Sequence, residues 1–251
     1  IGSTCAKTVV LNEKKEIIQE FVQPTGWSSV DTAEEIHQKL QLAGINLSDD
    51  SSCCVATGYG RISVPYADKT VTEITCHALG AVHLFQQPDL TVIDIGGQDT
   101  KIIQIEQGFV KDFIMNDKCA AGTGRFLEVM ANSLSLRPNE MFDLARLGSD
   151  TTISSMCTVF AESEVIGLIG KGEPKENIAY AVVNSTIRKV AAQVSRMNGE
   201  MFTFCLTGGL CECDYIREAL SKELGKDVFS CPDARYAGAI GAALSAMKVR
   251  R

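Results

Sequence analysis

The sequence lacks any apolar run close to the roughly 20 residues that a membrane-spanning helix needs. It also lacks a basic start followed by a signal-type apolar stretch, so no export signal is expected. Basic residues are not in excess either, and the formal net charge of −7 disfavours nucleic acid and anionic membranes as main partners. We therefore expect a cytoplasmic protein that binds neither nucleic acid nor membrane.

Cysteine, by contrast, is abundant. The chain carries ten cysteines, and their scattered placement favours reduced thiols over a disulfide framework. Most are expected to be core residues. Cys211 and Cys213 form a Cys-x-Cys after a glycine pair, where a metal or redox role stays open, but no third ligand is near and a packing role is favoured.

The order of apolar segments predicts an α/β protein whose organisation is duplicated. With 45% hydrophobic residues, the chain can bury one substantial core or two smaller cores across a cleft. The first part is expected to contain a hairpin, a helix, a strand and a helix, at residues 8–11 with 16–22, 31–42, 53–57 and 71–85. The second part is expected to contain strands 90–95, 101–105, 109–114, 202–206 and 227–230, and helices 122–133, 139–146, 159–169, 174–197, 215–223 and 235–247.

Each part opens with a strand, a turn of small residues and a second strand. The turns are Gly2-Ser3-Thr4 and Gly96-Gly97-Gln98-Asp99, and a third turn, Thr207-Gly208-Gly209, follows a late apolar strand. Such turns offer backbone N–H groups to an anion. A single one is more often an ordinary bend, but their repetition favours a nucleotide gripped between two lobes.

Two cysteines stand in a setting that the others lack. Cys119 lies in Asn116-Asp-Lys-Cys-Ala-Ala-Gly-Thr-Gly-Arg-Phe126 and Cys157 in Met156-Cys-Thr-Val-Phe-Ala-Glu-Ser-Glu-Val165, each just ahead of an expected helix. The positive end of a helix favours a thiolate and an anionic ligand such as an iron–sulfur cluster. A [4Fe-4S] cluster takes four thiolates, so two per chain predict one cluster shared across a two-fold homodimer. Two buried structural thiols are the alternative.

These motifs, together with Val92-Ile-Asp-Ile-Gly-Gly-Gln-Asp-Thr-Lys101 and Pro232-Asp-Ala-Arg-Tyr-Ala-Gly-Ala-Ile-Gly241, resemble the ATPase superfamily of actin, sugar kinases and heat-shock-70 proteins. Within it, nearly the whole chain resembles the activator ATPases of 2-hydroxyacyl-CoA dehydratases and their benzoyl-CoA reductase relatives. The two cysteine motifs separate this group from cluster-free kinases. The resemblance implies two ribonuclease-H-like lobes with a nucleotide cleft between them: residues 1–88 with 232–251 as lobe I, and 89–231 as lobe II.

The resemblance also implies roles for individual residues. The first phosphate loop would include Gly2, Ser3, Thr4 and Lys7, and the second Asp94, Gly96, Gly97, Gln98 and Asp99. Thr207, Gly208 and Gly209 would face the adenosine and its phosphates. The catalytic candidates are Asp94, which would hold Mg²⁺ through water, and Gln98 and Asp99, which would orient the attacking water.

One residue of the family pattern does not occur in the sequence. The family's first loop begins with an Asp two residues before the glycine that is Gly2 here, whereas this sequence starts at Ile1. We expect a few residues of a first strand to precede Ile1. If the carboxylate is truly lost, hydrolysis is in doubt while nucleotide binding is not.

By the same resemblance, the protein is expected to be an ATPase that delivers a low-potential electron. It would be a homodimer in which Cys119 and Cys157 of each chain hold one [4Fe-4S] cluster, and it would bind ATP or ADP with Mg²⁺. Electrons would come from a ferredoxin or flavodoxin and pass to an acyl-CoA dehydratase or reductase. Two alternatives stay open: a sugar or metabolite kinase of the same fold, and a nucleotide-dependent chaperone or scaffold. Neither alternative would need the two cysteines.

Overall fold

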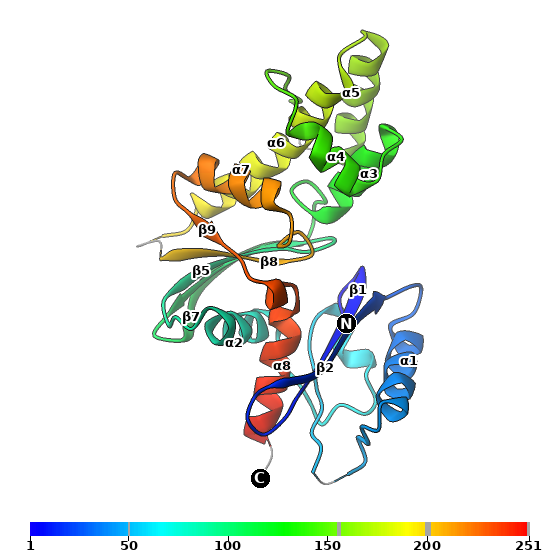
Figure 1. Cartoon of the computed structure of the whole chain (residues 1–251), viewed down its shortest axis with the longest axis vertical. Coiled ribbons are helices and arrows are strands. Elements are labelled where there is room, and N and C mark those ends of the chain that lie inside the picture. The colour runs from blue at the N-terminus through cyan, green and yellow to red at the C-terminus, as the bar shows by residue number, and fades with distance from the viewer. Residues whose placement is uncertain (50, 155–156, 199–201, 250–251) are drawn as a thin grey trace. The chain divides into compact units, whose positions relative to one another are not determined.

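Two compact units make up the chain in the computed structural model, which describes residues 1–49, 51–154, 157–198 and 202–249 (Figure 1). The first unit contains residues 1–90, 105–111 and 233–251, and the second contains residues 91–104 and 112–232. Whether these units act as nucleotide-binding lobes stays a prediction. No helix in the described part is long and apolar enough to cross a membrane.

The first unit begins with an antiparallel hairpin of β1 (Cys5–Leu11) and β2 (Ile17–Pro24). The Asn12 side chain closes its turn by accepting hydrogen bonds from the Lys14 and Glu16 amides, both at 2.9 Å. Ser28 caps the following helix by accepting from the Asp31 amide. The remaining elements are α1 (Ser29–Leu42), β3 (Val55–Ala56), the 3-10 helix η1 (Tyr59–Ser63), β4 (Lys69–Thr70), α2 (Glu73–Phe85), most of the 3-10 helix η2 (Pro232–Tyr236) and α8 (Ala237–Val249).

Helices α2 and α8 pack backbone against backbone in the first unit. A Cβ atom at Gly80 would collide with the Ala237 carbonyl, and one at Gly241 would collide with the Cys76 carbonyl. Only glycine therefore fits at these two positions. This close approach aligns the start of α8 along the first two turns of α2.

The second unit is built on a five-stranded sheet with the order β7-β6-β5-β8-β9. Its strands are β5 (Leu90–Ile95), β6 (Thr100–Glu106), β7 (Phe109–Asn116), β8 (Thr203–Gly208) and β9 (Val228–Phe229). Every residue of β5 is buried, as expected for a central strand covered on both faces. Strand β7 lies at one edge and is largely exposed or half-buried.

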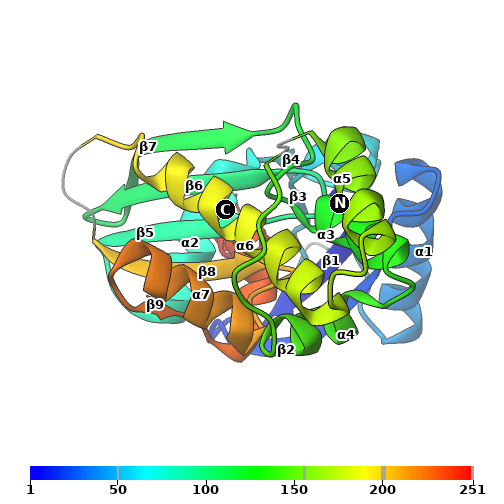
Figure 2. The same cartoon turned by 90° about the horizontal axis from the view of Figure 1, so that it is seen from above.

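Five helices complete the second unit: α3 (Gly124–Ser133), α4 (Pro138–Ala145), α5 (Thr158–Gly170), α6 (Lys175–Val194) and α7 (Asp214–Leu224). Figure 2 shows α6 and α7 lying across the sheet. Helix α3 packs against α5, and the Ser133 hydroxyl on α3 donates a 3.0 Å hydrogen bond to the Glu162 carboxylate on α5. The helices α3 and α5 thus form one small assembly.

The expected order of helices and strands is confirmed over the described residues, with differences at element ends. Helix α2 begins at Glu73 rather than at residue 71, because Thr72 caps it. Helix α8 begins at Ala237 rather than at residue 235, because a 3-10 turn precedes it. Strand β8 begins at Thr203 rather than at residue 202, and residues 199–201 before it lie outside the described residues.

Candidate functional site: the second phosphate turn and its neighbours

A tight turn joins the two central strands β5 and β6. The Gly96 amide donates a 2.9 Å hydrogen bond to the Asp99 carbonyl and closes the turn. The Asp99 carboxylate folds back over Gly96, where it would collide with any Cβ atom. A side chain at position 96 would therefore displace the Asp99 carboxylate, and a Cβ atom would also lie only 3.0 Å from the Asp99 carbonyl. Asp94 and Asp99 face the same strand end.

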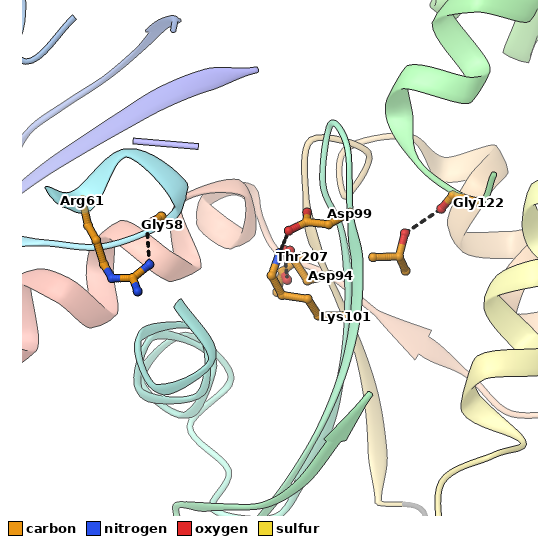
Figure 3. A network of polar contacts seen from close by, with 8 residues as sticks. Gly58, Arg61, Asp94, Asp99, Lys101, Gly122 and Thr207 are labelled. Atoms are coloured by element: carbon orange, nitrogen blue, oxygen red, sulfur yellow. Dashed lines mark hydrogen bonds and ion pairs between the residues drawn. The ribbon is translucent and has the colours of Figure 1, made fainter. Parts of the chain in front are cut away.

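Asp94 is buried, with an exposed fraction of 2%, and is bound at both carboxylate oxygens. Its Oδ1 accepts a 2.8 Å hydrogen bond from the Thr207 hydroxyl at the end of β8. Its Oδ2 lies 3.4 Å from the Lys101 ammonium, which lies 2.7 Å from Oδ2 of Asp99. Figure 3 shows these four side chains gathered at the ends of the strands.

The third small-residue turn lies directly against the end of β5. Gly208 adopts φ +89°, and a Cβ atom there would collide with the Ile95 carbonyl. That carbonyl also accepts a 3.2 Å hydrogen bond from the Gly209 amide. The structure thus brings Thr207, Gly208 and Gly209 to the second turn, more than 100 residues away in the sequence.

The second turn also holds the start of α3. The Gly124 amide donates a 2.9 Å hydrogen bond to the Gly96 carbonyl, and the Arg125 amide donates one of 2.7 Å to the Gly97 carbonyl. The buried Thr100 hydroxyl donates a third, of 2.6 Å, to the Gly122 carbonyl. The dashed line to Gly122 in Figure 3 marks this bond, on the side of the strand away from Lys101.

Cys119 lies in the short loop between β7 and α3 and is exposed. The Asn116 side-chain amide holds this loop by donating to the Cys119 carbonyl at 2.9 Å and to the Ala121 carbonyl at 3.1 Å. Cys119 stands ahead of α3 beside the glycine-containing turn, and the helix begins at Gly124 rather than at the expected residue 122, because residues 120–123 form a turn that places Gly122 at φ +86°.

Cys157 is the N-cap residue of α5 and is exposed. Three residues earlier, the Ser154 amide donates to both carboxylate oxygens of Glu164, at 3.0 and 3.1 Å, so Ser154 is held against α5. Met156, part of the sequence motif, lies outside the described residues. Of the two candidate cysteines, Cys157 caps its helix, whereas Cys119 lies five residues before the first residue of α3.

Helix α5 carries apolar residues on its exposed surface as well as its buried one. Val159, Phe160, Ile166 and Ile169 are exposed by 70%, 67%, 59% and 46%. Only Ala161 and Val165 of this helix are buried. An apolar helix with so little of its surface covered is typical of an interaction surface.

The first small-residue turn lies in the first unit. Thr25 holds it: its amide donates to the Thr4 carbonyl at 3.0 Å and its hydroxyl to the Gly2 carbonyl at 2.7 Å. Ser3 is exposed. Lys7 lies on β1, opposite Val22 of β2, rather than in the turn.

The other cysteines are free thiols that suit packing. Burial raises the pKa of Cys54 to about 11 and that of Cys205 to about 12. Cys211 is buried, and burial also raises the pKa of the half-buried Cys213, which precedes α7. Among the described residues, no group of three or more His, Cys, Asp or Glu side chains could hold a metal ion.

Two further polar residues belong to the second turn although the sequence analysis assigns them no role. Thr100 and Lys101 begin β6, and a polar pair at this position is commonly explained as the end of a strand. Their contacts with Gly122, Asp94 and Asp99 arise only in the folded protein, so no local pattern indicates them.

The comparisons with known proteins agree over almost the whole chain. Residues 1–246 match the BadF/BadG/BcrA/BcrD ATPase family. The chain is 43% identical over 253 residues to the (R)-2-hydroxyglutaryl-CoA dehydratase activating ATPase of Acidaminococcus fermentans, covering 99% of this chain and 95% of that protein. The crystal structure of that dehydratase's component A superposes with a TM-score of 0.91 at 41% identity, covering 100% and 96% of the two chains.

Two other solved structures extend the comparison. The activator of the 2-hydroxyisocaproyl-CoA dehydratase from Clostridium difficile, with bound ADPNP, has a TM-score of 0.89 at 34% identity and covers 100% of this chain and 93% of its own. A ROK family glucokinase from Streptomyces griseus has a TM-score of 0.60 at 15% identity, covering 99% and 97%, and shows the fold alone. The expected actin-like ATPase fold is confirmed.

Proposed function

Because the chain belongs to the BadF/BadG/BcrA/BcrD ATPase family, we propose that it is an ATP-dependent activator of a 2-hydroxyacyl-CoA dehydratase or related reductase. It delivers a low-potential electron through a [4Fe-4S] cluster shared by two copies of the chain. The observation that carries this proposal is the pair of exposed cysteines in the unit that also holds the second phosphate turn.

The donor set fits such a cluster. Cys119 and Cys157 are exposed thiols, and Cys157 stands at the positive end of a 13-residue helix. A [4Fe-4S] cluster needs four thiolates, and the described residues of one chain offer no group of three potential ligands. Two chains related by a two-fold axis would supply all four. When bound, the cluster supplies one-electron transfer.

The exposed surface of α5 supports the homodimer. Val159 and Phe160 immediately follow Cys157 and are exposed by 70% and 67%. Contact with the same helix of a second copy would remove these side chains from water at the place where the cysteines must meet. Burial of apolar surface is worth roughly 25 cal/mol per Å², so α5 can contribute to association as well as to ligation.

The nucleotide-binding part of the proposal rests on the three turns. The Gly2 and Gly96 amides close their own turns on the Cys5 and Asp99 carbonyls. The backbone amides of Ser3 and Thr4 in the first unit, and of Gly97 and Gln98 in the second, suit phosphate oxygens. Thr207, Gly208 and Gly209 suit the adenosine side. Asp94 would hold Mg²⁺ through water, and Gln98 and Asp99 would orient the attacking water.

Two backbone hydrogen bonds give ATP hydrolysis a route to the cysteines. The carbonyls of Gly96 and Gly97 accept from the first two residues of α3, and α3 packs on α5, which Cys157 precedes. A change in the turn when the γ-phosphate leaves would therefore be transmitted to α3 and α5, and so to the positions of Cys119 and Cys157. We propose this as the coupling between hydrolysis and electron delivery.

The proposed partners follow from the relatives. Those relatives activate acyl-CoA dehydratases, so the acceptor is an acyl-CoA dehydratase or reductase component, and the donor is a ferredoxin or flavodoxin. None of the ten cysteines is part of a disulfide, which suits the reducing cytoplasm. A metabolite kinase or a chaperone of the same fold would have no use for two exposed thiols beside α3 and α5.

The test is the iron and acid-labile sulfide content of anaerobically purified protein, with its ultraviolet–visible spectrum before and after air. About two irons per chain and a brown chromophore that bleaches in air are expected for one cluster per dimer. A colourless protein that hydrolyses ATP and stays iron-free after anaerobic reconstitution would contradict the electron-transfer function and favour a kinase.

A further inference from the structure

Lys101 is almost completely buried, with an exposed fraction of 2%. Its ammonium lies 2.7 Å from Asp99 Oδ2 and 3.4 Å from Asp94 Oδ2. We propose that Lys101 is a positioning residue that holds these two carboxylates together at the second phosphate turn and offsets one of their charges. This inference rests on the proposed function of that turn in ATP binding.

The charges at the turn call for such a cation. Two carboxylates at one strand end repel each other, and an incoming triphosphate repels both. Mg²⁺ travels with the nucleotide and offsets only part of the phosphate charge. A fixed ammonium between Asp94 and Asp99 lowers the local charge from −2 to −1 before any nucleotide arrives. Buried charges are tolerated when they are paired in this way.

Lys101 also fixes the orientation of both carboxylates. Asp94 is held at Oδ1 by the Thr207 hydroxyl, at 2.8 Å, and at Oδ2 by Lys101. Asp99 is drawn by Lys101 across Gly96, within the turn that the Gly96 amide closes. Without the ammonium, repulsion between the two carboxylates would favour movement of Asp99 out of this position.

Substitution of Lys101 tests the inference through nucleotide binding rather than through turnover. On anaerobically prepared protein, the Kd of ADPNP is measured by calorimetry at fixed Mg²⁺. Lys101→Met, which keeps much of the apolar stem, should weaken ADPNP binding about tenfold or more, because one unit of negative charge near the phosphates is no longer offset. Lys111→Met is the control, since the Lys111 side chain is 47% exposed and pairs with Glu106 at the surface.

Asp99→Asn separates a charge role from a packing role. The double variant Asp99→Asn with Lys101→Met has the wild-type local charge and should recover ADPNP binding to within about threefold of wild type. Asp99→Asn alone should bind ADPNP at least as tightly as wild type while hydrolysing ATP more slowly. This single variant tests the inference even if Lys101→Met fails to fold.

The outcomes distinguish the inference from the function on which it rests. Wild-type protein that does not bind ADPNP would overturn the proposed ATP site and the role of Lys101 with it. Wild-type binding that Lys101→Met leaves unchanged would overturn the role of Lys101 alone. The role of Lys101 would also be overturned if the double variant bound ADPNP as weakly as Lys101→Met does, because that is the result expected when the lysine only supports the local structure. Weaker ADPNP binding by Asp99→Asn than by wild type would overturn it as well.

Discussion

The Gly124 amide donates a 2.9 Å hydrogen bond to the Gly96 carbonyl, which joins the first residue of α3 to the turn between β5 and β6. Gly124 also has little room for a side chain, since a Cβ atom would lie 3.3 Å from the same carbonyl. The loop that carries Cys119 ends in this contact. Gly96 is therefore part of the proposed phosphate site and also helps to position the loop that carries Cys119.

Replacing the cluster cysteines should remove iron without removing nucleotide binding. Cys119→Ala and Cys157→Ala are each expected to abolish the cluster, because either substitution leaves only two of the four thiolates in the dimer. Iron analysis and ADPNP calorimetry on the same anaerobic sample measure both properties. Cys53→Ala, at a half-buried position in the first unit, is the control. A full complement of iron in either cluster variant would disprove the ligand assignment.

Asp94→Asn should impair ATP hydrolysis and spare the cluster. The substitution removes the negative charge that would hold Mg²⁺ through water. A neutral asparagine is also a weaker partner for the Lys101 ammonium than the aspartate carboxylate is. A fall in kcat of at least about tenfold is expected. The measurement is steady-state phosphate release, with the cluster spectrum recorded alongside. Unchanged turnover would show that Asp94 has no part in the reaction.

Thr100→Val should weaken the link between nucleotide and cysteine loop. The valine keeps the shape of threonine but withdraws the hydroxyl that donates to the Gly122 carbonyl at 2.6 Å. Loss of one buried hydrogen bond costs about 1–3 kcal/mol. Hydrogen exchange of residues 117–124 with and without ADPNP is the measurement. We expect nucleotide-dependent protection in wild type and much less in the variant, and equal protection in both would contradict the link.

The helix pair of the first unit gives a stability prediction. Gly241→Ala would push a methyl group into the Cys76 carbonyl, and overpacking of this kind costs about 1–3 kcal/mol. Gly167→Ala in α5 is the matched control, because nothing lies within 4 Å of the added Cβ and alanine favours a helix by about 0.5–1 kcal/mol. Thermal unfolding should show a lower Tm for the first variant only.

Alkaline pH should destabilise the protein through its buried thiols. Burial raises the pKa of Cys54 to about 11 and that of Cys205 to about 12, from 9.0. The unfolded chain loses these protons first, so the stabilisation is complete below pH 9.0 and falls as pH rises through the folded values. Each thiol contributes at most about 1.4 kcal/mol per pH unit. Denaturant unfolding of Cys205→Ala should show a shallower fall, and an identical slope would contradict this linkage.

The sequence predicts the elements well and their mutual contacts poorly. Alternation and helical spacing identify β5, β6 and α6, because each has a long, regular pattern of apolar residues. The expected strand at 53–57 is found as the shorter β3, and the pattern overlooks its partner β4, which spans two residues and carries no periodicity of its own. It also starts α3 two residues early, because Gly122 in its left-handed conformation belongs to the turn and not to the helix.

The candidate site shows the same limit. Residues within one turn, such as Gly96 and Asp99, are predictable because the turn is local. The Thr207–Asp94 hydrogen bond joins residues 113 positions apart, and no local pattern indicates which late strand will lie beside β5. Lys101 escapes notice for a related reason, since its role depends on two carboxylates that only the folded sheet brings to one ammonium.

Thr100 and Lys101 are consecutive residues of β6, and consecutive side chains of a strand point to opposite faces of the sheet. Thr100 therefore reaches the Gly122 carbonyl on one face, while Lys101 reaches Asp94 and Asp99 on the other. The length of the turn before them fixes which residue takes which face. Deleting one residue between Gly97 and Asp99 would shift the register by one, exchange the two faces, and lose both contacts at once.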